Sequence, residues 1–206
     1  MIFLSRVPSG FDYWFFEKAL SIKLCNKIIE LGKKTHKQKG QININKSSIK
    51  DLTTRNCKVA FLNKTWIYKT IHPYIHTANK NAGWNYDWDF TEECQFTEYS
   101  KGNFYDWHCD SWPDQYSNTD DKNRLNKTRK LSVTVSLSDP KKYKGGELEF
   151  DLRNNRSGKP NLINCSEIMP KGSIVVFPSH VWHRVKPVTK GIRHSLVAWN
   201  LGKLFR

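Results

Sequence analysis

The chain has 206 residues, enough for one domain, and its eight Trp, eight Tyr and eleven Phe supply ample material for a core. No run approaches about 18 consecutive apolar residues, and Met1 to Gly10 lack the pattern of a secretory signal, so we expect neither a membrane helix nor secretion. Five scattered cysteines without a C-x-x-C pair fit a reducing compartment, so we expect a cytoplasmic protein.

The formal net charge of +15 fits either an anionic partner such as nucleic acid or simply a basic surface. The Lys and Arg residues are spread from Arg6 to Arg206 without a dense block, and no nucleic-acid-binding motif is present. We therefore expect a basic surface that can steer acidic small molecules, without a nucleic-acid partner and without a membrane partner.

The first 85 residues or so are expected to be mainly helical. Ser21 is a candidate N-cap for a helix that Gly32 would end, and residues 33–54 are polar enough to form a loop. Isoleucines recurring every four residues predict a second helix over about 65–81. On that helix His72 and His76 have a zinc-binding spacing, but no third ligand is evident, so we expect a solvated face.

From about residue 86 the chain changes to short strands separated by polar turns. Apolar and polar residues alternate in most of these strands, which predicts half-buried β-structure. The expected strands are near 94–99, 104–110, 131–137, 147–150, 174–177, 183–185 and 193–199, and long polar loops fill 111–128 and 151–166. The pattern favours an α+β, mainly β fold, a jelly roll with the N-terminal helices packed on one sheet, in a single domain over 1–206.

A metal site is suggested by the short stretch around His108 and Asp110. Residues i and i+2 of a strand point to the same face, so this imidazole and carboxylate can bind one ion, while Cys109 would face away. His183 is a candidate third ligand, and His180 competes with it from a turn. Two His and one carboxylate leave the opposite side of a metal open, as in non-haem Fe(II) oxygenases.

An arginine ten residues after His183 adds a second part to the site. Arg193 and Ser195 alternate on one strand, so their side chains share a face. A guanidinium binds a carboxylate bidentately, so Arg193 can hold the distal carboxylate of a dicarboxylate such as 2-oxoglutarate. Ser195 and Tyr99, nine residues before His108, are candidates for additional hydrogen bonds to the same group.

The chain resembles the Fe(II)/2-oxoglutarate-dependent dioxygenases, within them the prolyl 4-hydroxylase-like group, over about residues 90–200. The resemblance implies a double-stranded β-helix, Fe(II) held by His108, Asp110 and His183, and 2-oxoglutarate held by Arg193. Many prolyl hydroxylases of this group carry Lys where this chain has Arg193. The matching blocks are Gln95-Phe96-Thr97-x-Tyr99-x-x-Gly102-x-Phe104-Tyr105-x-Trp107-His108-x-Asp110, Lys130-Leu131-Ser132, Gly145-Gly146-Glu147-Leu148, Phe177-Pro178-Ser179 and His183-x-Val185-x-Pro187-Val188-Thr189-x-Gly191-x-Arg193-x-Ser195-Leu196-Val197.

The resemblance implies hydroxylation of a C–H bond with O2 as cosubstrate, release of succinate and CO2, and ascorbate as a candidate reductant. A peptidyl proline is the first substrate candidate. A free amino acid or other small molecule, and a non-catalytic jelly-roll binding module, are the alternatives; oxidative demethylation of nucleic acid is suggested only by the charge. Candidate substrate residues flank the metal ligands: Tyr105, Trp107, Trp182 and Arg184.

Overall fold

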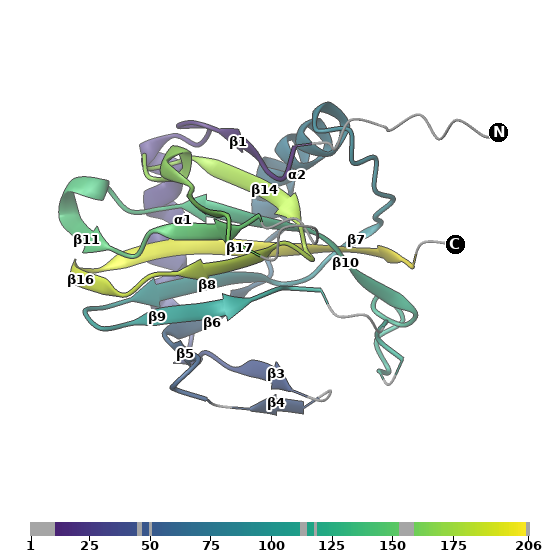
Figure 1. Cartoon of the computed structure of the whole chain (residues 1–206), viewed down its shortest axis with the longest axis horizontal. Coiled ribbons are helices and arrows are strands. Elements are labelled where there is room, and N and C mark those ends of the chain that lie inside the picture. The colour runs from purple at the N-terminus through teal and green to yellow at the C-terminus, as the bar shows by residue number, and fades with distance from the viewer. Residues whose placement is uncertain are drawn as a thin grey trace.

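The computed structural model describes residues 11–44, 47–49, 51–111, 115–117, 119–152 and 159–204, and of 42–44 and 47–49 the backbone alone. Two α-helices, α1 (Ile22–Lys34) and α2 (Thr65–Asn81), lie in the N-terminal part (Figure 1). The strands are β1 (Trp14–Phe16), β2 (Gln38–Lys39), β3 (Ile42–Ile44), β4 (Ser47–Ile49), β5 (Arg55–Asn56), β6 (Lys58–Leu62), β7 (Phe90–Thr91), β8 (Cys94–Tyr99), β9 (Phe104–His108), β10 (Lys127–Ser136), β11 (Tyr143–Gly145), β12 (Leu148–Asp151), β13 (Leu162–Asn164), β14 (Ile174–Pro178), β15 (Trp182–Val185), β16 (Val188–Gly191) and β17 (Arg193–Lys203).

Two antiparallel sheets dominate the described residues. The larger sheet has eight strands, in the order β1-β14-β10-β17-β8-β6-β2 with β7 beside β17. The smaller sheet has five, in the order β13-β12-β15-β9-β5, and two further ribbons pair β11 with β16 and β3 with β4. Several neighbours in the two large sheets, such as β1 with β14 and β9 with β15, are far apart in sequence, as in a rolled double sheet.

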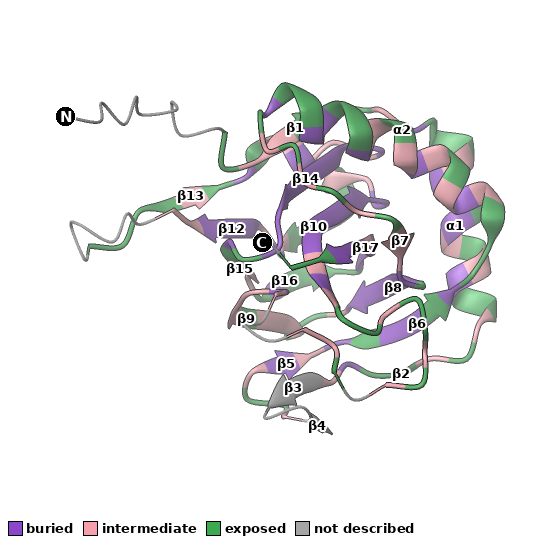
Figure 2. Ribbon diagram, turned by 90° about the vertical axis from the view of Figure 1, so that its right-hand side faces the viewer, coloured by how far each residue is buried: buried purple, intermediate pink, exposed green. Residues whose placement is uncertain are grey.

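The central strands of the larger sheet are buried on both faces. One face packs against α1 and α2, and the core there combines helix residues such as Ile28 and Ile71 with Phe96 and Leu196 of the central strands. The other face meets the smaller sheet in a second core built around residues such as Phe177. Figure 2 shows both helices on one side of the strands, with buried residues between the layers. The expected jelly roll with helices on one sheet is confirmed.

Helix α1 shows how the sequence fixes its ends. Ser21 is extended and its Oγ accepts the Leu24 backbone N–H at 3.2 Å, so the predicted N-cap is confirmed. The predicted stop at Gly32 is wrong, because the helix continues to Lys34 and is capped by Thr35. Gly32 lies against the ring of Phe96, where a Cβ would collide with it, so this glycine permits close packing of helix on sheet.

Three further expectations differ from the structure. Residues 33–54, expected as loop, contain β2, β3 and β4, and the N-terminal part therefore adds strands as well as helices. The 151–166 loop contains β13, which pairs with β12; its residues Asn154 to Ser157 lie outside the described part. Strand β8, expected to be half-buried, is buried at all six positions because the helices cover one face and the smaller sheet the other.

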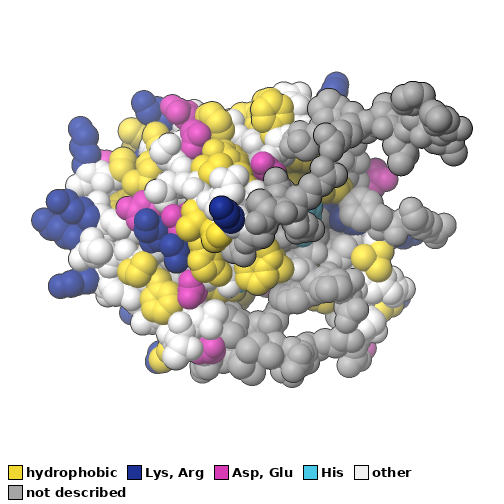
Figure 3. All heavy atoms as spheres, viewed as in Figure 1, with side chains coloured by type: hydrophobic (Ala, Val, Ile, Leu, Met, Phe, Trp, Pro, Cys, Tyr) yellow, Lys and Arg dark blue, Asp and Glu magenta, His cyan; other side chains and the backbone are white. Residues whose placement is uncertain are grey.

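The basic surface is dense at one end of the molecule. Lys144 and Lys190 are direct cross-strand partners in the β11–β16 ribbon, and both are exposed. Figure 3 shows dark-blue side chains gathered at the left end, where Figure 1 places these strands. The rest of the visible face mixes apolar, acidic and basic groups. None of the described helices is long and apolar enough to span a membrane.

Candidate metal centre

The smaller sheet brings two histidines together. His108 ends β9 and His183 lies in β15, and the two residues are direct partners in the antiparallel register. Their ring centroids are 4.2 Å apart. Directly opposed residues of neighbouring strands project to the same face of a sheet, so sheet register alone places both imidazoles at one point between the two sheets.

Asp110 completes the group by a route that differs from the expected one. Strand β9 ends at His108, so strand alternation does not orient the carboxylate. Instead the backbone N–H groups of Asp110 and Ser111 both donate to the carbonyl of Ser179 at 2.9 Å. This turn directs the Asp110 side chain to the histidines: its oxygens lie 3.9 Å from His108 Nε2 and 3.6 Å from His183 Nε2.

The three donors have the arrangement of ligands for one ion. One ligand atom from each of His108, Asp110 and His183 lies within 4.8 Å of the others. His108 Nδ1 is 2.7 Å from the Asp106 carbonyl and His183 Nδ1 is 3.0 Å from the Val181 carbonyl. Because a carbonyl only accepts, each Nδ1 carries the proton and each Nε2 presents a lone pair. This donor set fits Fe(II).

Burial and neighbouring groups together set the protonation of two of the donors. Burial and the neighbouring His183 hold the pKa of His108 well below its usual value, so its imidazole is neutral and able to bind a metal. Burial alone would raise the pKa of Asp110, but His183, His108 and Arg129 together hold it below its usual value. The carboxylate is therefore ionised, as a metal ligand must be.

Two buried serines orient the Asp110 carboxylate through hydrogen bonds. Ser132 Oγ donates to Asp110 Oδ2 at 2.7 Å, and Ser179 Oγ lies 2.9 Å from Ser132 Oγ. Both serines are fully buried. The sequence indicated neither role, although both serines lie in blocks that carry the family resemblance. A polar residue in a strand that is buried on both faces is the signal that could have pointed to them, because a buried hydroxyl needs a hydrogen-bond partner.

An ion pair between Arg129 and Glu92 lies beside the turn at Asp110. Arg129 donates to Glu92 from Nε at 2.8 Å and Nη2 at 2.6 Å, and its guanidinium lies over the Trp199 ring at 3.9 Å. Tyr116 of the long loop after Asp110 donates to the same carboxylate at 3.2 Å. Glu92 therefore ties this loop to the strand that carries Ser132, a contact that sequence reasoning missed.

Arg193 has the surroundings expected of a carboxylate clamp. It begins β17 opposite Tyr99, its guanidinium lies 5.4 Å from the Tyr99 ring, and both side chains are buried. A Cβ on Gly146 would lie only 2.9 Å from Arg193 Cδ, so the Gly-Gly turn makes room for the arginine. Arg193 Nη1 is buried and has no hydrogen-bond partner within the described residues. A buried, unpartnered guanidinium nitrogen fits a bound carboxylate.

The neighbours of Arg193 follow the expected alternation. Ser195 is buried and faces Thr97 across the strands. Burial raises the pKa of Tyr99, so its hydroxyl stays protonated and can donate. His194, on the opposite face, contacts Glu98 and Ser138 and stacks on the ring of Phe96, which is a structural role.

The four candidate substrate residues divide between two places. Tyr105 stacks on the ring of His108 with centroids 3.5 Å apart, so it lies at the metal centre. Trp182 and Arg184 flank His183 in β15 and therefore point to the opposite face of the sheet. Arg184 pairs with Glu149 at 2.6 Å and covers the ring of Trp107. The last three residues therefore lie outside the metal centre, and their substrate role stays a prediction.

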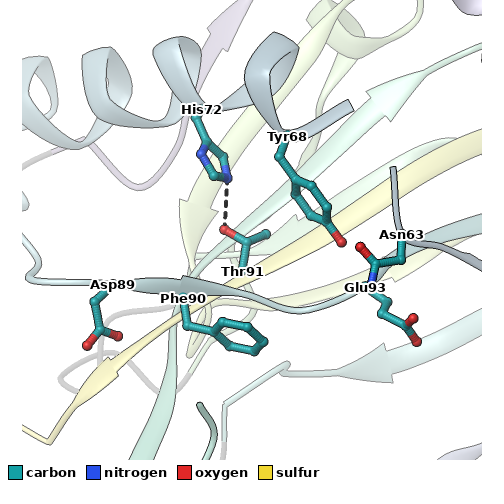
Figure 4. Close-up of a pocket in the computed structure, with 7 residues that line it drawn as sticks. All are labelled: Asn63, Tyr68, His72, Asp89, Phe90, Thr91 and Glu93. Atoms are coloured by element: carbon teal, nitrogen blue, oxygen red, sulfur yellow. Dashed lines mark hydrogen bonds between the residues drawn. The ribbon is translucent and has the colours of Figure 1, made fainter. Parts of the chain in front are cut away.

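The structure also places His180 and His72, the other histidines considered as metal ligands. His180, the rival of His183, is exposed and is not part of the group of donors. His72 is half-buried rather than solvated: its Nε2 lies 3.0 Å from Thr91 Oγ1, and Trp88 packs between it and His76. His72 and Thr91 line a separate pocket of about 350 Å³ that contains none of the three proposed metal donors. Figure 4 shows His72 of α2 pointing to Thr91 of β7.

The fold and site together define a class of metal-dependent oxygenase with a double-stranded β-helix. The family model of the 2OG-Fe(II) oxygenase superfamily matches residues 94–200, and this chain belongs to that superfamily. PKHD-type hydroxylases are similar over shorter stretches: 35% identity over 105 residues in Prochlorococcus marinus (50% of this chain, 39% of that protein) and 34% over 79 residues in Synechococcus sp. strain JA-3-3Ab (38% and 31%). The matched stretch is thus under half the length of these curated relatives.

Solved structures share the fold at low identity. A viral collagen prolyl hydroxylase from Paramecium bursaria Chlorella virus-1, in complex with 2OG, has 19% identity and a TM-score of 0.63 over 95% of this chain and 99% of its own. A Trichoplax adhaerens prolyl hydroxylase, in complex with a peptide of hypoxia inducible factor, has 17% identity and a TM-score of 0.67, covering 92% and 83%. These likenesses confirm the expected double-stranded β-helix.

Proposed function

We propose that this chain is an Fe(II)- and 2-oxoglutarate-dependent dioxygenase that hydroxylates a C–H bond of a peptidyl proline, with release of succinate and CO2. The convergence of His108, Asp110 and His183 carries the proposal, because these donors offer one ion a neutral–neutral–anionic ligand set. The unpartnered Nη1 of Arg193 supports it independently, since an anion must neutralise that buried charge.

Each residue has a defined task in this reaction. His108, Asp110 and His183 would hold Fe(II) from one side. The hydroxyl of Ser132 orients the Asp110 carboxylate by donating to its Oδ2. Arg193, with Tyr99 and Ser195, would hold the distal carboxylate of 2-oxoglutarate. The bound iron and cosubstrate supply the oxidising chemistry from O2. The two sheets exclude water around these groups, since the flanking side chains Phe150 and Phe177 are fully buried.

A peptide substrate is supported by the relatives, and the choice of proline depends on them. The viral neighbour is a collagen prolyl hydroxylase, and the Trichoplax enzyme is in complex with a peptide. A small-molecule hydroxylase remains the alternative, because the family fixes the chemistry and not the substrate. A non-catalytic module is less well supported, because the donor set and the arginine are all in place.

The direct test is incubation of the protein with Fe(II), 2-oxoglutarate and a panel of proline-containing peptides, with ascorbate as reductant. We expect one added oxygen on a proline and succinate in equal amount. Fe(II)-dependent succinate without any modified peptide would retain the dioxygenase and reject the peptide substrate. Succinate formation that does not depend on Fe(II) would reject the dioxygenase itself.

We also propose a reducing compartment, the cytoplasm, as the location. All five cysteines are free thiols, and Cys25, Cys57, Cys94 and Cys165 are buried in the two cores. Free buried thiols are typical of proteins in reducing compartments. Cys109, the half-buried one, donates to the carbonyl of Ser111 at 3.1 Å and is not one of the grouped metal donors.

A further inference from the structure

A second buried arginine lies beside the metal centre, and nothing above gives it a task. Arg55 belongs to β5, opposite Tyr105 of β9, and only 5% of it is exposed. Its guanidinium lies over the Tyr105 ring at 4.4 Å, and the same ring stacks on His108 at 3.5 Å. Arg55, Tyr105 and His108 thus form a continuous stack that ends at a proposed metal ligand.

The chain holds this arginine firmly but leaves part of it unused. Arg55 Nη1 donates to the Gln41 carbonyl at 2.8 Å, and Nε donates to Cys57 Sγ at 3.2 Å. A Cβ on Gly40 would lie 2.5 Å from Nε, so glycine is required for this placement. The remaining nitrogen, Nη2, is buried and has no partner within the described residues. Because hydrogen bonds hold Nε and Nη1 in place, Nη2 is a preorganised donor for a ligand.

Counting charges shows that the cosubstrate does not need this arginine. Fe(II) with Asp110 carries one net positive charge and Arg193 adds a second, which the two carboxylates of 2-oxoglutarate balance. Arg55 adds a third positive charge, and the described groups that act most on that charge are Cys57, Tyr105 and Tyr99, none of which is a carboxylate. A buried, unpaired cation is costly, so the occupied pocket needs one more anion.

We propose that Arg55 binds a carboxylate of the substrate, so that the enzyme selects substrates with a carboxylate near the carbon that is hydroxylated. This inference rests on the proposed function and adds the substrate's chemical class to it. The carboxylate comes from an acidic side chain or C-terminus of a peptide, or from a free amino or organic acid; all present the same group to Nη2.

Position along the stack supports this assignment. Arg55 and His108 both contact the Tyr105 ring, at 4.4 Å and 3.5 Å from its centroid, so a ligand of Arg55 would lie close to the metal centre. Arg193 approaches from the other sheet, opposite Tyr99. Both charges act on the Tyr99 hydroxyl, whose pKa burial raises and the two arginines lower. The two arginines therefore serve one pocket from two walls.

The first experiment measures carboxylate binding without turnover. Protein saturated with Zn(II) and 2-oxoglutarate is titrated with acetate and, separately, with the neutral isostere acetamide, and binding is followed by NMR of the arginine guanidinium groups. We expect acetate to bind at least tenfold more tightly than acetamide, to lose this preference in Arg55→Met and to regain part of it in Arg55→Lys. Lys144→Met is the control, because it removes an exposed cation of the β11–β16 ribbon that has no role in the proposed site.

The outcomes separate this proposal from the function that it extends. Equal binding of acetate and acetamide by the unmodified protein overturns it, and so does an acetate preference that survives in Arg55→Met. The affinity for 2-oxoglutarate should stay within about twofold in Arg55→Met; a loss as large as that in Arg193→Met would assign Arg55 to the cosubstrate instead. Failure to bind Zn(II) or 2-oxoglutarate at all would reject the dioxygenase, not the arginine's role.

A second experiment distinguishes the sources of the carboxylate. Proline peptides with a flanking Asp are compared with their Asn counterparts, C-terminal acids with C-terminal amides, and both with free L-proline, all as competitors of acetate. We expect one acidic form to compete at least tenfold better than its neutral partner. If each neutral form competes as well as the acidic one, selection by Arg55 is rejected.

Discussion

His108 and His183 are direct cross-strand partners in the smaller sheet, although 75 residues separate them in the chain. Their relative position is therefore a property of the β9–β15 register and not of either local sequence. A slip of one residue would turn one imidazole to the outer face. The register shift between His183 and Val185 lies directly beside this pair, so the ladder is regular at the histidines and irregular just past them.

The first prediction concerns the metal. Replacement of His108 by Ala should lower Fe(II) affinity at least tenfold and abolish Fe(II)-dependent succinate formation, because two donors remain where three are needed. The fold should persist, since the side chain lies at the edge of the pocket and 13% of it is exposed. Isothermal titration with Fe(II) under anaerobic conditions, together with circular dichroism, measures both effects.

His180→Ala is the matched control for this change. It removes an exposed imidazole three residues before His183, which sequence spacing alone could have made the ligand. Metal affinity should be unaltered in this variant. A loss in His180→Ala that equals the loss in His108→Ala would contradict the assignment of His183.

The second prediction concerns the cosubstrate clamp. Arg193→Met should raise the concentration of 2-oxoglutarate needed for half-saturation by roughly 10- to 100-fold, since a charge-assisted hydrogen bond to a buried carboxylate contributes about 1.5–3 kcal/mol. Arg193→Lys should restore part of the affinity, because a single ammonium keeps the charge and loses the bidentate geometry. An unaltered requirement in Arg193→Met would place the clamp elsewhere.

The third prediction tests the support behind Asp110. Ser132→Ala removes the 2.7 Å hydrogen bond to Asp110 Oδ2 and leaves that oxygen free to turn from the metal. Fe(II) affinity should fall roughly 10-fold or more, as with other residues that orient metal ligands. The exposed Ser166 offers a control for the same substitution. Identical affinities in both variants would show that the Ser179 turn alone orients the carboxylate.

The fourth prediction is a loss of stability in acid, to which His194 contributes from outside the metal centre. Burial holds the pKa of His194 below its usual value, so as the pH falls below about 6.5 the unfolded chain takes up a proton that the folded one resists. Burial tends to raise the pKa of Glu98, but its bond to Lys37 outweighs this and lowers it, so its contribution is lost at still lower pH. Urea unfolding from pH 8 to pH 4 should show stability falling throughout.

The His194 part of this slope can be isolated. His194→Gln should reduce the pH dependence between about pH 6.5 and pH 5 while leaving the steeper fall near pH 4 in place. If His194→Gln keeps the full slope, another group carries it.

The polar alternation in the strands shows where sequence reading reached its limit. Gln95 and Thr97 of β8, and Ser132 and Thr134 of β10, alternate with apolar residues as in a strand with one wet face. In the structure all four are buried. The apolar partners face the helices, and the polar ones face the space between the sheets, where the site lies. A strand with one face in solvent and a strand with one face toward a polar pocket have the same alternating sequence, so only the packing of the sheets distinguishes the two cases.

Other features of the site carried no signal in the sequence. Arg55, Glu92 and Arg129 are charged residues in a basic chain, and their neighbours in sequence do not indicate burial. In the structure Arg55 is only 5% exposed, and the side chains of Glu92 and Arg129 are 4% and 12% exposed. Their roles depend on contacts between segments about 35 to 50 residues apart, such as Arg129 with Glu92 and Arg55 with Tyr105.

The sequence by itself determined the class of chemistry: His108, Asp110, His183 and Arg193 occur in the right order with the right spacing, and the expected fold and family are confirmed. Tertiary structure decided the geometry. Strand β9 ends too early for alternation to aim Asp110, so the Ser179 carbonyl and the Ser132 hydroxyl do so. It also decided which arginine nitrogens are buried without a hydrogen-bond partner among the described residues, because burial and pairing are properties of the packed sheets and of no single segment.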